Sequence, residues 1–249
     1  MKKLKPTYIF GRHPVADFIE RSPKDVKIIF VKNTIKDIDL SELRAAAGKH
    51  GIPFQTVSEK EIKRYVSDEV NHQGIVASIV WNFEYTNFRE WLGKIDPESD
   101  MAVLILDHIT DVHNFGAIIR SATAAGISAI LVDGSNQAPA NPTTFKTSAG
   151  TLGLVPIIQV GNITESIKQL QQNKFWVAGL DTRGKQSIWD IDMKGPMAFL
   201  IGSEGEGVSE LALKNCDFHV NVPLAEGVES LNASVTSALV SFEWRRRLS

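Results

Sequence analysis

The feature that most constrains the fold of this chain is a short apolar run that recurs between helical segments. Residues 101–106 (Met-Ala-Val-Leu-Ile-Leu) hold no polar side chain, and parallel sheets bury strands of this kind on both faces. Five more strands are predicted after it, at residues 127–132, 155–160, 175–180, 197–201 and 218–222. Helices are predicted at residues 114–125, 143–149, 163–172 and 232–247. This alternation predicts an α/β domain with a mostly parallel sheet.

The first part of the chain also alternates strands with helices. Strands are predicted at residues 26–31, 52–57 and 73–80, and helices at residues 41–50 and 58–66. Ser58, followed three residues later by Glu61, forms a capping box that marks the start of the second helix. Residues 82–99 interrupt the alternation with aromatic, Pro, Asp and Ser residues. We therefore predict a domain at residues 1–81, a linker at 82–99 with few protecting contacts, and a second domain at 100–249.

Two loops near the carboxyl end combine glycine with polar side chains. The first is Gly202-Ser-Glu-Gly-Glu-Gly207, and the second lies within residues 222–234 (Val-Pro-Leu-Ala-Glu-Gly-Val-Glu-Ser-Leu-Asn-Ala-Ser). Each loop follows a predicted strand, and open α/β sheets bind ligands at the carboxyl ends of their strands. Glycine adopts positive φ easily and lets a ligand lie directly on the backbone. The two loops therefore predict a ligand pocket.

The composition of the first glycine loop narrows the class of ligand. The loop lacks the Lys-Ser/Thr of a P-loop and the Gly-x-Gly-x-x-Gly spacing of dinucleotide-binding turns. Its carboxylates, Glu204 and Glu206, would repel a phosphate. An uncharged or cationic ligand fits better. S-adenosylmethionine meets this condition, because it carries a sulfonium cation and no phosphate.

A third segment, residues 107–125, runs from the end of a predicted strand into a helix rich in Gly, Ala and Ser. Side chains this small allow the helix to approach another backbone closely, so we predict a tight helix contact. Asn114 is predicted to cap this helix and Gly126 to end it. Arg120 lies among apolar neighbours, so its charge either has a partner or a functional role, or reaches the surface along its own stem.

No metal site is predicted from this sequence. The third segment brings two histidines and two aspartates together, but they fit no i, i+4 ligand pair on one helix: Asp107, His108, Asp111 and His113. The single cysteine, Cys216, excludes an internal disulfide and any zinc site built from several cysteines. It is interpreted as a buried thiol.

The charge of the chain is unevenly distributed. Residues 1–90 carry 15 Lys+Arg against 12 Asp+Glu, and residues 91–249 carry 12 against 17. A basic first part suits a polyanionic partner, although a solvated surface explains three charges equally well. No apolar run approaches the roughly 18 residues of a membrane span, and no apolar stretch follows the Met-Lys-Lys start. A cytoplasmic protein without a membrane partner is expected.

Taken together, three segments resemble the SpoU (TrmH-like) family of RNA 2′-O-ribose methyltransferases, within the SPOUT superfamily. The family's motifs resemble Asn114-Phe-Gly-Ala-Ile-Ile-Arg120, residues 201–207 and residues 222–234, in the same order and spacing. Residues 9–15 and 73–77 are similar to the ribosomal-protein-like substrate-binding domain of the two-domain bacterial ribosomal RNA members. The chain departs from the family at Val112, where proline is frequent, and at Val222, where isoleucine is common.

This resemblance implies a site as well as a fold. The second domain is expected to be a trefoil-knotted SPOUT domain with a mostly parallel sheet, preceded by a small α/β substrate-binding domain, and the protein is expected to be a homodimer with its active site near the subunit interface. The resemblance implies that S-adenosylmethionine is bound by Gly202, Ser203, Gly207, Val222, Leu224 and Leu231. It implies that the catalytic residues are Arg120, Asn114, Glu204, Ser230 and Asn232.

The function that the resemblance implies is methylation of the ribose 2′-hydroxyl of RNA, on a guanosine of large-subunit ribosomal RNA. The two-domain layout favours ribosomal over transfer RNA. A transfer RNA 2′-O-methyltransferase and a non-catalytic RNA-binding module remain the alternatives. The role of Arg120 also stays open: arginine is a poor base, so Arg120 either loses its proton in an unusual environment or holds the adjacent phosphate bidentately.

Overall fold

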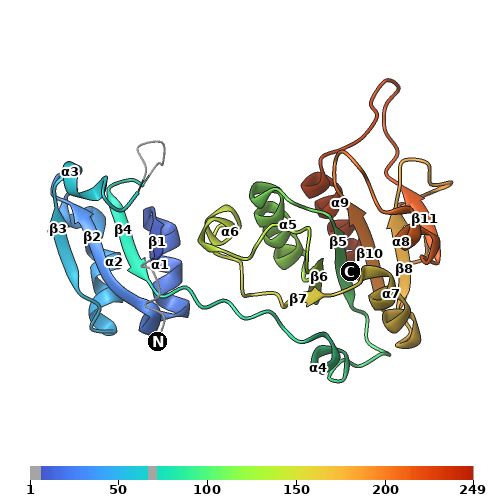
Figure 1. Ribbon diagram of the computed structural model, residues 1–249, viewed down its shortest axis with the longest axis horizontal. Coiled ribbons are helices and arrows are strands. Elements are labelled where there is room, and N and C mark those ends of the chain that lie inside the picture. The colour runs from blue at the N-terminus through green and yellow to red at the C-terminus, as the bar shows by residue number, and fades with distance from the viewer. Residues whose placement is uncertain (1–6, 67–71, 249) are drawn as a thin grey trace. The chain divides into compact units, whose positions relative to one another are not determined.

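The computed structural model describes residues 7–66 and 72–248. The chain forms two compact units, one of residues 1–83 with 140–150 and one of residues 84–139 with 151–249 (Figure 1). Within the described residues, none of the helices combines the length and the apolar character that crossing a membrane requires.

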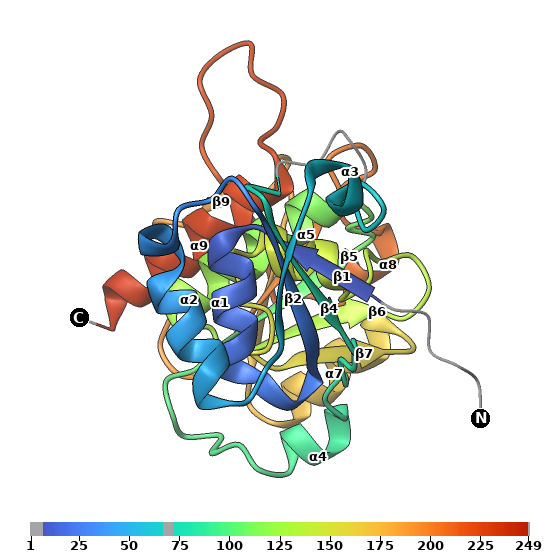
Figure 2. The same cartoon turned by 90° about the vertical axis from the view of Figure 1, so that its left-hand side faces the viewer.

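The first unit is built on a four-stranded mixed sheet in the order β1-β4-β2-β3. Its strands are β1 (Thr7–Phe10), β2 (Val26–Lys32), β3 (Phe54–Val57) and β4 (Ile75–Ile79). β4 pairs antiparallel with β1 and β2, while β2 and β3 are parallel. The helices are α1 (Arg12–Arg21), α2 (Asp37–Lys49), α3 (Glu59–Ile62) and α6 (Pro142–Thr147). α1 and α2 lie side by side (Figure 2), and α6 packs on β1.

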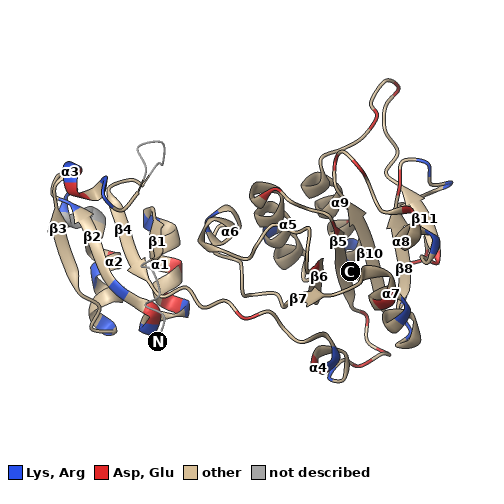
Figure 3. Ribbon diagram, in the orientation of Figure 1, with Lys and Arg blue, Asp and Glu red and all other residues tan. Residues whose placement is uncertain are grey.

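Two sequence features of the first unit have visible structural consequences. The predicted capping box is confirmed, because the Ser58 backbone N–H donates to Glu61 Oε2 at 2.8 Å and the Ser58 hydroxyl accepts from the Glu61 N–H. The helix it opens is shorter than predicted and ends at Ile62. Lys and Arg occur on several elements of this unit with Asp and Glu among them, so its charge does not mark one face (Figure 3).

The second unit contains a seven-stranded sheet in the order β7-β6-β5-β10-β8-β11-β9. Its strands are β5 (Ala102–Asp107), β6 (Ala129–Asp133), β7 (Ile157–Val160), β8 (Trp176–Leu180), β9 (Gln186–Ser187), β10 (Met197–Gly202) and β11 (Phe218–Asn221). Every pairing between them is parallel, which confirms the predicted sheet. All six residues of β5 are buried. The carboxyl ends of β5, β8 and β10 therefore meet at one edge.

Helices cover this sheet and bring the third sequence segment into place. They are α4 (Phe88–Leu92), α5 (Val112–Ala125), α7 (Ile163–Gln172), α8 (Glu210–Lys214) and α9 (Ala233–Arg247). The close helix contact predicted from small residues is the packing of α5 on α9, in which Gly116 and Ala122 are buried. The predicted start of α5 is wrong. Asp111, not Asn114, caps the helix, because its carboxylate accepts the N–H groups of His113 and Asn114 at 3.2 and 3.3 Å.

The buried face of α9 differs from the apolar stripe in its sequence. The i, i+3, i+4, i+7 pattern starts at Val235 and ends at Phe242, yet these side chains are 46% and 50% exposed. The packed face instead includes Ser237 and Ser241. Their hydroxyls donate to carbonyl oxygens one turn earlier, at 2.8 and 2.6 Å, so burying them leaves no polar group unpaired. The two ends of the apolar stripe, Val235 and Phe242, are consequently left on the surface of this unit, while Ala238 and Leu239 between them are half-buried.

The region predicted as a linker is partly structured. Residues 84–99 belong to the second unit, and α4 within them is capped by Asn87, whose side chain accepts the Glu90 N–H at 3.1 Å. Phe88 and Trp91 pack against the core cluster of the second unit. Residues 80–85 have no regular secondary structure. The domain boundaries themselves stay a prediction.

We expect chymotrypsin to make its first cuts after Phe83 or Tyr85, because backbone outside helices and strands is more open to proteolysis than backbone within them. Phe88 and Trp91 lie in α4 and serve as internal controls, since they are aromatic residues of the same kind held in a packed helix. Mass spectrometry of the early fragments distinguishes the sites. First cuts within α4 or inside residues 101–222 would contradict the predicted boundary.

Candidate active site

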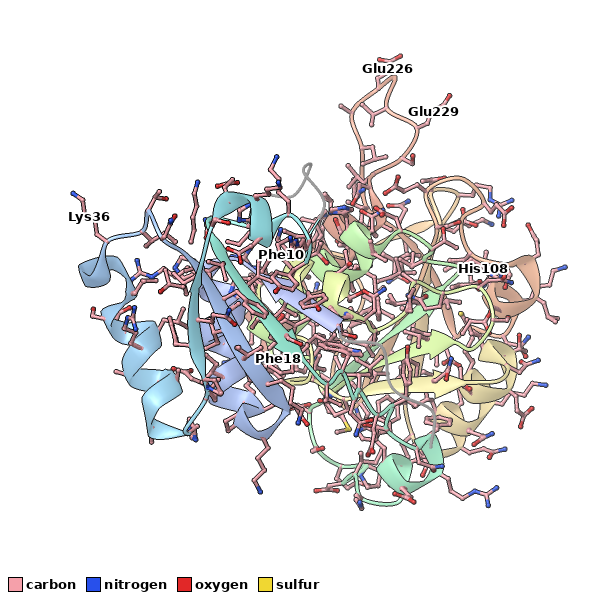
Figure 4. All side chains as sticks on the ribbon, turned by 60° about the vertical axis from the view of Figure 1, so that its left-hand side comes forward. Phe10, Phe18, Lys36, His108, Glu226 and Glu229 are labelled. Atoms are coloured by element: carbon pink, nitrogen blue, oxygen red, sulfur yellow. The ribbon has the colours of Figure 1, made fainter. Side chains whose placement is uncertain are left out.

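A cavity of about 490 Å³ lies at the carboxyl ends of β8 and β10. Its walls come from the ends of these strands, from the loop after β11 and from the start of α9. All six residues predicted to bind the cofactor line this cavity: Gly202, Ser203, Gly207, Val222, Leu224 and Leu231. Ser230 lines it as well. The loop that contributes Leu224 and Leu231 projects from the unit (Figure 1), and Glu226 and Glu229 lie near its tip (Figure 4).

A second cavity, of about 590 Å³, lies beside the first. Residues 108–111 after β5 line it, together with Asn114 of α5 and Asn136 after β6. Residues 203–206 and Ala233 line both cavities, so the first glycine loop forms a wall that the two share. A ligand in one cavity is therefore separated from a ligand in the other only by this loop and the start of α9.

Three predicted catalytic residues meet at this shared wall. The Asn114 amide Nδ2 donates to Glu204 Oε1 at 2.8 Å. Asn232 Nδ2 donates to Asn114 Oδ1 at 2.9 Å and also to Glu204 Oε1. These residues are 90 and 118 positions apart in the chain, and the fold joins them in one closed hydrogen-bond network.

Asn232 uses both ends of its side-chain amide. Its Oδ1 caps α9 by accepting the backbone N–H groups of Ser234 and Val235 at 2.8 and 3.4 Å. Its Nδ2 is thereby turned toward Asn114 and Glu204. The start of α9 and the geometry of the network therefore depend on the same side chain.

The structure explains why position 202 holds glycine, and the explanation differs from the one inferred from the sequence. A Cβ built on Gly202 would lie 2.0 Å from the carbonyl carbon of Gly207 and 2.3 Å from the nitrogen of Val208. The loop closes on itself there, with the Gly207 N–H donating to the Ser203 carbonyl at 2.9 Å. The prediction that Gly202 lets a ligand approach the backbone is therefore incomplete. A side chain at this position would first collide with the backbone of Gly207 and Val208.

Arg120 is placed apart from the other predicted catalytic residues. Its side chain is exposed on α5 and lines neither cavity. At about 100° per residue, six positions turn the helix so that Arg120 and Asn114 point about 120° apart. The sequence left two interpretations of Arg120 open: a residue with a partner or a functional role, or a side chain that reaches the surface. Its exposure agrees with the second.

The sequence reasoning missed a polar segment that follows β8. Asp181, Thr182 and Arg183 line the first cavity. Arg183 Nη2 contacts Asp181 Oδ2 at 2.6 Å and Glu210 Oε1 at 3.3 Å. The hydrogen bond from Arg183 lowers the pKa of Asp181, whose carboxylate stays charged. The sequence did contain a signal for this segment, because residues 181–183 directly follow a predicted strand whose carboxyl end lies at the same edge of the sheet.

The histidines and carboxylates of the third segment have individual tasks. Asp111 caps α5, while Asp107 Oδ1 contacts His108 Nδ1 at 2.6 Å. In the described part of the chain, no group of three or more His, Cys, Asp and Glu is placed to hold a metal ion.

The chemistry of the first cavity suits a nucleoside that carries a positive charge. Its volume falls in the usual range of small-molecule sites. Its apolar lining, which an adenine ring can contact, includes Leu180, Ile201, Val222, Leu224 and Leu231. Its carboxylates are Asp181, Glu204, Glu206 and Glu210, and the one arginine that lines it is paired. The donor set therefore fits the sulfonium of S-adenosylmethionine better than a phosphate.

The family resemblance inferred from the motifs is confirmed by sequence matches. Residues 101–242 match the SpoU rRNA Methylase family, and residues 8–80 match the family described as RNA 2′-O ribose methyltransferase substrate binding. The chain is 34% identical over 239 residues to 23S rRNA (guanosine-2′-O-)-methyltransferase RlmB of Pseudomonas putida, covering 94% of each chain. It is 32% identical over 242 residues to RlmB of Xanthomonas campestris, covering 95% of this chain and 94% of the relative.

Solved structures share the fold. The SpoU methyltransferase AviRb from Streptomyces viridochromogenes, in complex with AdoMet, superposes with a TM-score of 0.75 at 22% identity, covering 98% of this chain and 90% of that one. An AdoMet-bound rRNA methyltransferase from Sinorhizobium meliloti gives 0.75 at 24% identity, covering 98% and 88%. On its sequence matches over both parts, this chain belongs to the SpoU rRNA methylase family.

Proposed function

We propose that this protein transfers the methyl group of S-adenosylmethionine to a ribose 2′-hydroxyl of RNA, on a guanosine of large-subunit ribosomal RNA. The observation that carries the proposal is the pair of cavities that share residues 203–206, with Asn114, Glu204 and Asn232 joined at the wall between them. One cavity suits the donor and the other the acceptor. Two relatives named as 23S rRNA guanosine-2′-O-methyltransferases support the choice of RNA.

S-adenosylmethionine supplies an activated methyl group on its sulfonium. The chain's contribution is to align the hydroxyl and to remove its proton, since the donor needs no further activation. Gly202, Val222 and Leu231 line the donor side. Asn114 and Asn232 hold the Glu204 carboxylate through two amide donors, which fixes the wall between the cavities.

The proposal includes a homodimer. The apolar stripe on α9, whose two ends Val235 and Phe242 are exposed, supports a second copy as its partner, because an apolar face that its own chain leaves uncovered is a frequent interface feature. Arg120 supports it as well, since this residue is exposed on α5 and lines neither cavity of its own chain. We propose that Arg120 reaches the site of the partner, where it holds the phosphate beside the target ribose.

The first unit is proposed to bind the RNA. Its match to a substrate-binding family supports this role, and the excess of basic residues in residues 1–90 is consistent with it. Lys and Arg are spread over several elements rather than gathered on one (Figure 3), so shape and hydrogen bonding are expected to contribute besides charge. A ribosomal RNA substrate also supports the proposed cytoplasmic location.

We expect Leu224→Arg to weaken the binding of S-adenosylmethionine at least about tenfold, because a bulky cation would then face the sulfonium and the adenine site. Isothermal titration calorimetry without RNA measures the dissociation constant. Leu154→Arg is the matched control, since Leu154 is 57% exposed and lines neither cavity. Equal affinity in both variants would place the donor elsewhere.

The experiment that tests the proposed function is methyl transfer from labelled S-adenosylmethionine to protein-free large-subunit ribosomal RNA. The modified nucleotide is expected to resist alkaline cleavage, because 2′-O-methylation removes the hydroxyl that attacks the phosphate. Label on a base would overturn the reaction. Transfer to unmodified transfer RNA alone would favour the alternative substrate, and RNA binding without any transfer would favour the non-catalytic alternative.

A further inference from the structure

One residue that lines the second cavity, His108, carries an imidazole that has no role in the site described above. His108 is the first residue after β5 and lines the cavity (labelled in Figure 4). Its Nδ1 lies 2.6 Å from Oδ1 of Asp107, the last residue of the strand. The imidazole is partly exposed, with 36% of its side chain accessible, while the Asp107 side chain is almost fully buried at 2%.

The Asp107 carboxylate is fixed from both sides. Its Oδ2 accepts the backbone N–H of Ser209 at 2.8 Å, which ties the end of β5 to the segment after the glycine loop. Its Oδ1 is left for the imidazole. A fixed carboxylate at Nδ1 selects the tautomer that carries the proton on Nδ1, and the lone pair is then on Nε2.

The backbone at His108 is unusual for a residue with a side chain. Its φ is +59°, in the left-handed region that favours glycine and asparagine. Non-glycine residues held in this region often occur at functional sites, where the surrounding structure maintains the strain. A turn that needed only to reverse the chain would be served better by glycine.

The position of His108 relative to the two cavities indicates its task. It lines the acceptor cavity with Asn114 and Glu204 and does not line the donor cavity. The other ionisable side chains lining the acceptor cavity are the carboxylates of Asp111 and Glu206, and no lysine or arginine among the described residues lines it. A hydroxyl approaching the donor through this cavity therefore meets one imidazole, that of His108.

We propose that His108, held by Asp107, is the general base that removes the proton of the target hydroxyl. This inference rests on the proposed methyl transfer. As the bond between the ribose oxygen and the methyl carbon forms, the bond between that carbon and sulfur breaks and its electron pair stays on sulfur. The hydroxyl proton moves to His108 Nε2 and is later released to water. Arg120 then has no proton to accept and serves only to hold the phosphate.

The first test is kinetic and uses the full-length protein with protein-free large-subunit ribosomal RNA. His108→Gly is expected to lower the single-turnover rate by about 10²–10⁴-fold, with unchanged affinity for S-adenosylmethionine. Glycine relieves the strain of the positive φ, which offsets the loss of the Asp107 contact, so the melting temperature should stay close to that of the wild type. Added imidazole is expected to restore part of the rate. His113→Asn, an exposed histidine of α5 outside both cavities, is the control and should keep the wild-type rate.

The pH profile supplies a second readout. A base must be neutral to act, so the wild-type rate is expected to fall as the pH is lowered. His108→Gly is expected to lose that dependence on pH. A rate within threefold of wild type, or the same profile without His108, would overturn the proposal while leaving the methyltransferase assignment intact.

The third readout needs no turnover. Nitrogen-15 chemical shifts of His108 in the protein alone, at a pH where the ring is neutral, are expected to show a proton on Nδ1 and a bare Nε2. Asp107→Asn should change this tautomer, because an amide can donate to Nδ1. A proton on Nε2 in the wild type would overturn the proposal. Wild-type protein that methylates no RNA would overturn the proposed function, and the base assignment with it.

Discussion

Arg120→Ala is expected to lower kcat for methylation of ribosomal RNA by at least about a hundredfold, while the dissociation constant for S-adenosylmethionine stays that of the wild type. The exposed guanidinium lines no cavity of its own chain, so its removal leaves the donor site intact. It is expected to contact the target phosphate in the transition state, and loss of such a contact lowers kcat and kcat/KM together. Methyl incorporation and calorimetry measure the two quantities.

The controls for Arg120 separate charge from shape. Arg120→Lys keeps the charge but loses the planar, two-pronged donor, so it should be almost as impaired. Arg89→Ala removes an exposed arginine of α4 far along the chain from the motifs and should leave kcat unchanged. Near-normal turnover in Arg120→Ala would remove this residue from the catalytic set.

Mixed dimers test whether Arg120 acts across the interface. The informative dimer combines one Arg120→Ala chain with one Leu224→Arg chain. If each site uses the donor cavity of its own chain and the arginine of the partner, the site on the Arg120→Ala chain has both parts intact. The site on the Leu224→Arg chain then has neither part intact. Equal co-refolding of the two variants should then restore about a quarter of wild-type activity, since half of the dimers are mixed and each holds one working site. Arg120 acting within its own chain would give no restoration.

Gly202→Val is expected to destabilise the fold by about 3 kcal/mol or more. The new Cβ would lie 2.0 Å from a backbone carbon of Gly207, and backbone within a closed loop cannot move aside as a flexible side chain can. Loss of donor binding in this variant is then a consequence of the distorted loop. Urea unfolding measures the free energy of unfolding for the variant and the wild type.

Gly205→Val provides the matched control for that measurement. Gly205 belongs to the same loop and lines both cavities, but a Cβ there meets no atom within 4 Å. Its φ lies outside the left-handed region, so valine adds no backbone strain of that kind. The free energy of unfolding should stay within about 0.5 kcal/mol of wild type. Equal destabilisation by both substitutions would contradict the steric explanation for Gly202.

The parallel sheet could be predicted from sequence because its signal is local. Runs such as residues 101–106 are apolar on both faces, whichever strands lie beside them. The buried face of α9 could not be predicted in the same way, because it depends on the partner helix. α5 presents small residues, so serines whose hydroxyls bond within the helix pack there, and Val235 and Phe242 remain exposed. The sequence does not indicate which helix α9 meets.

The candidate site was predictable in part for a similar reason. Loops that follow parallel strands converge at one edge, so Glu204 and Asn232 could be placed together in advance. The individual hydrogen bonds within the site could not be predicted. Asn114 contacts Glu204 because Asp111 takes over the capping of α5, and this choice between two possible caps depends on the path of the preceding loop. The Arg183 ion pair at the cavity was overlooked although β8 ends at the same edge.

The double use of Asn232 restricts what evolution can place at this position. Aspartate would cap α9 equally well but would set a second carboxylate against Glu204, and serine could cap the helix but offers no amide to donate. Glutamine carries the amide one carbon farther from the helix end. Of these residues, only asparagine both caps the helix and donates an amide to Glu204, so a substitution that keeps the helix start still loses the hydrogen bond in the site.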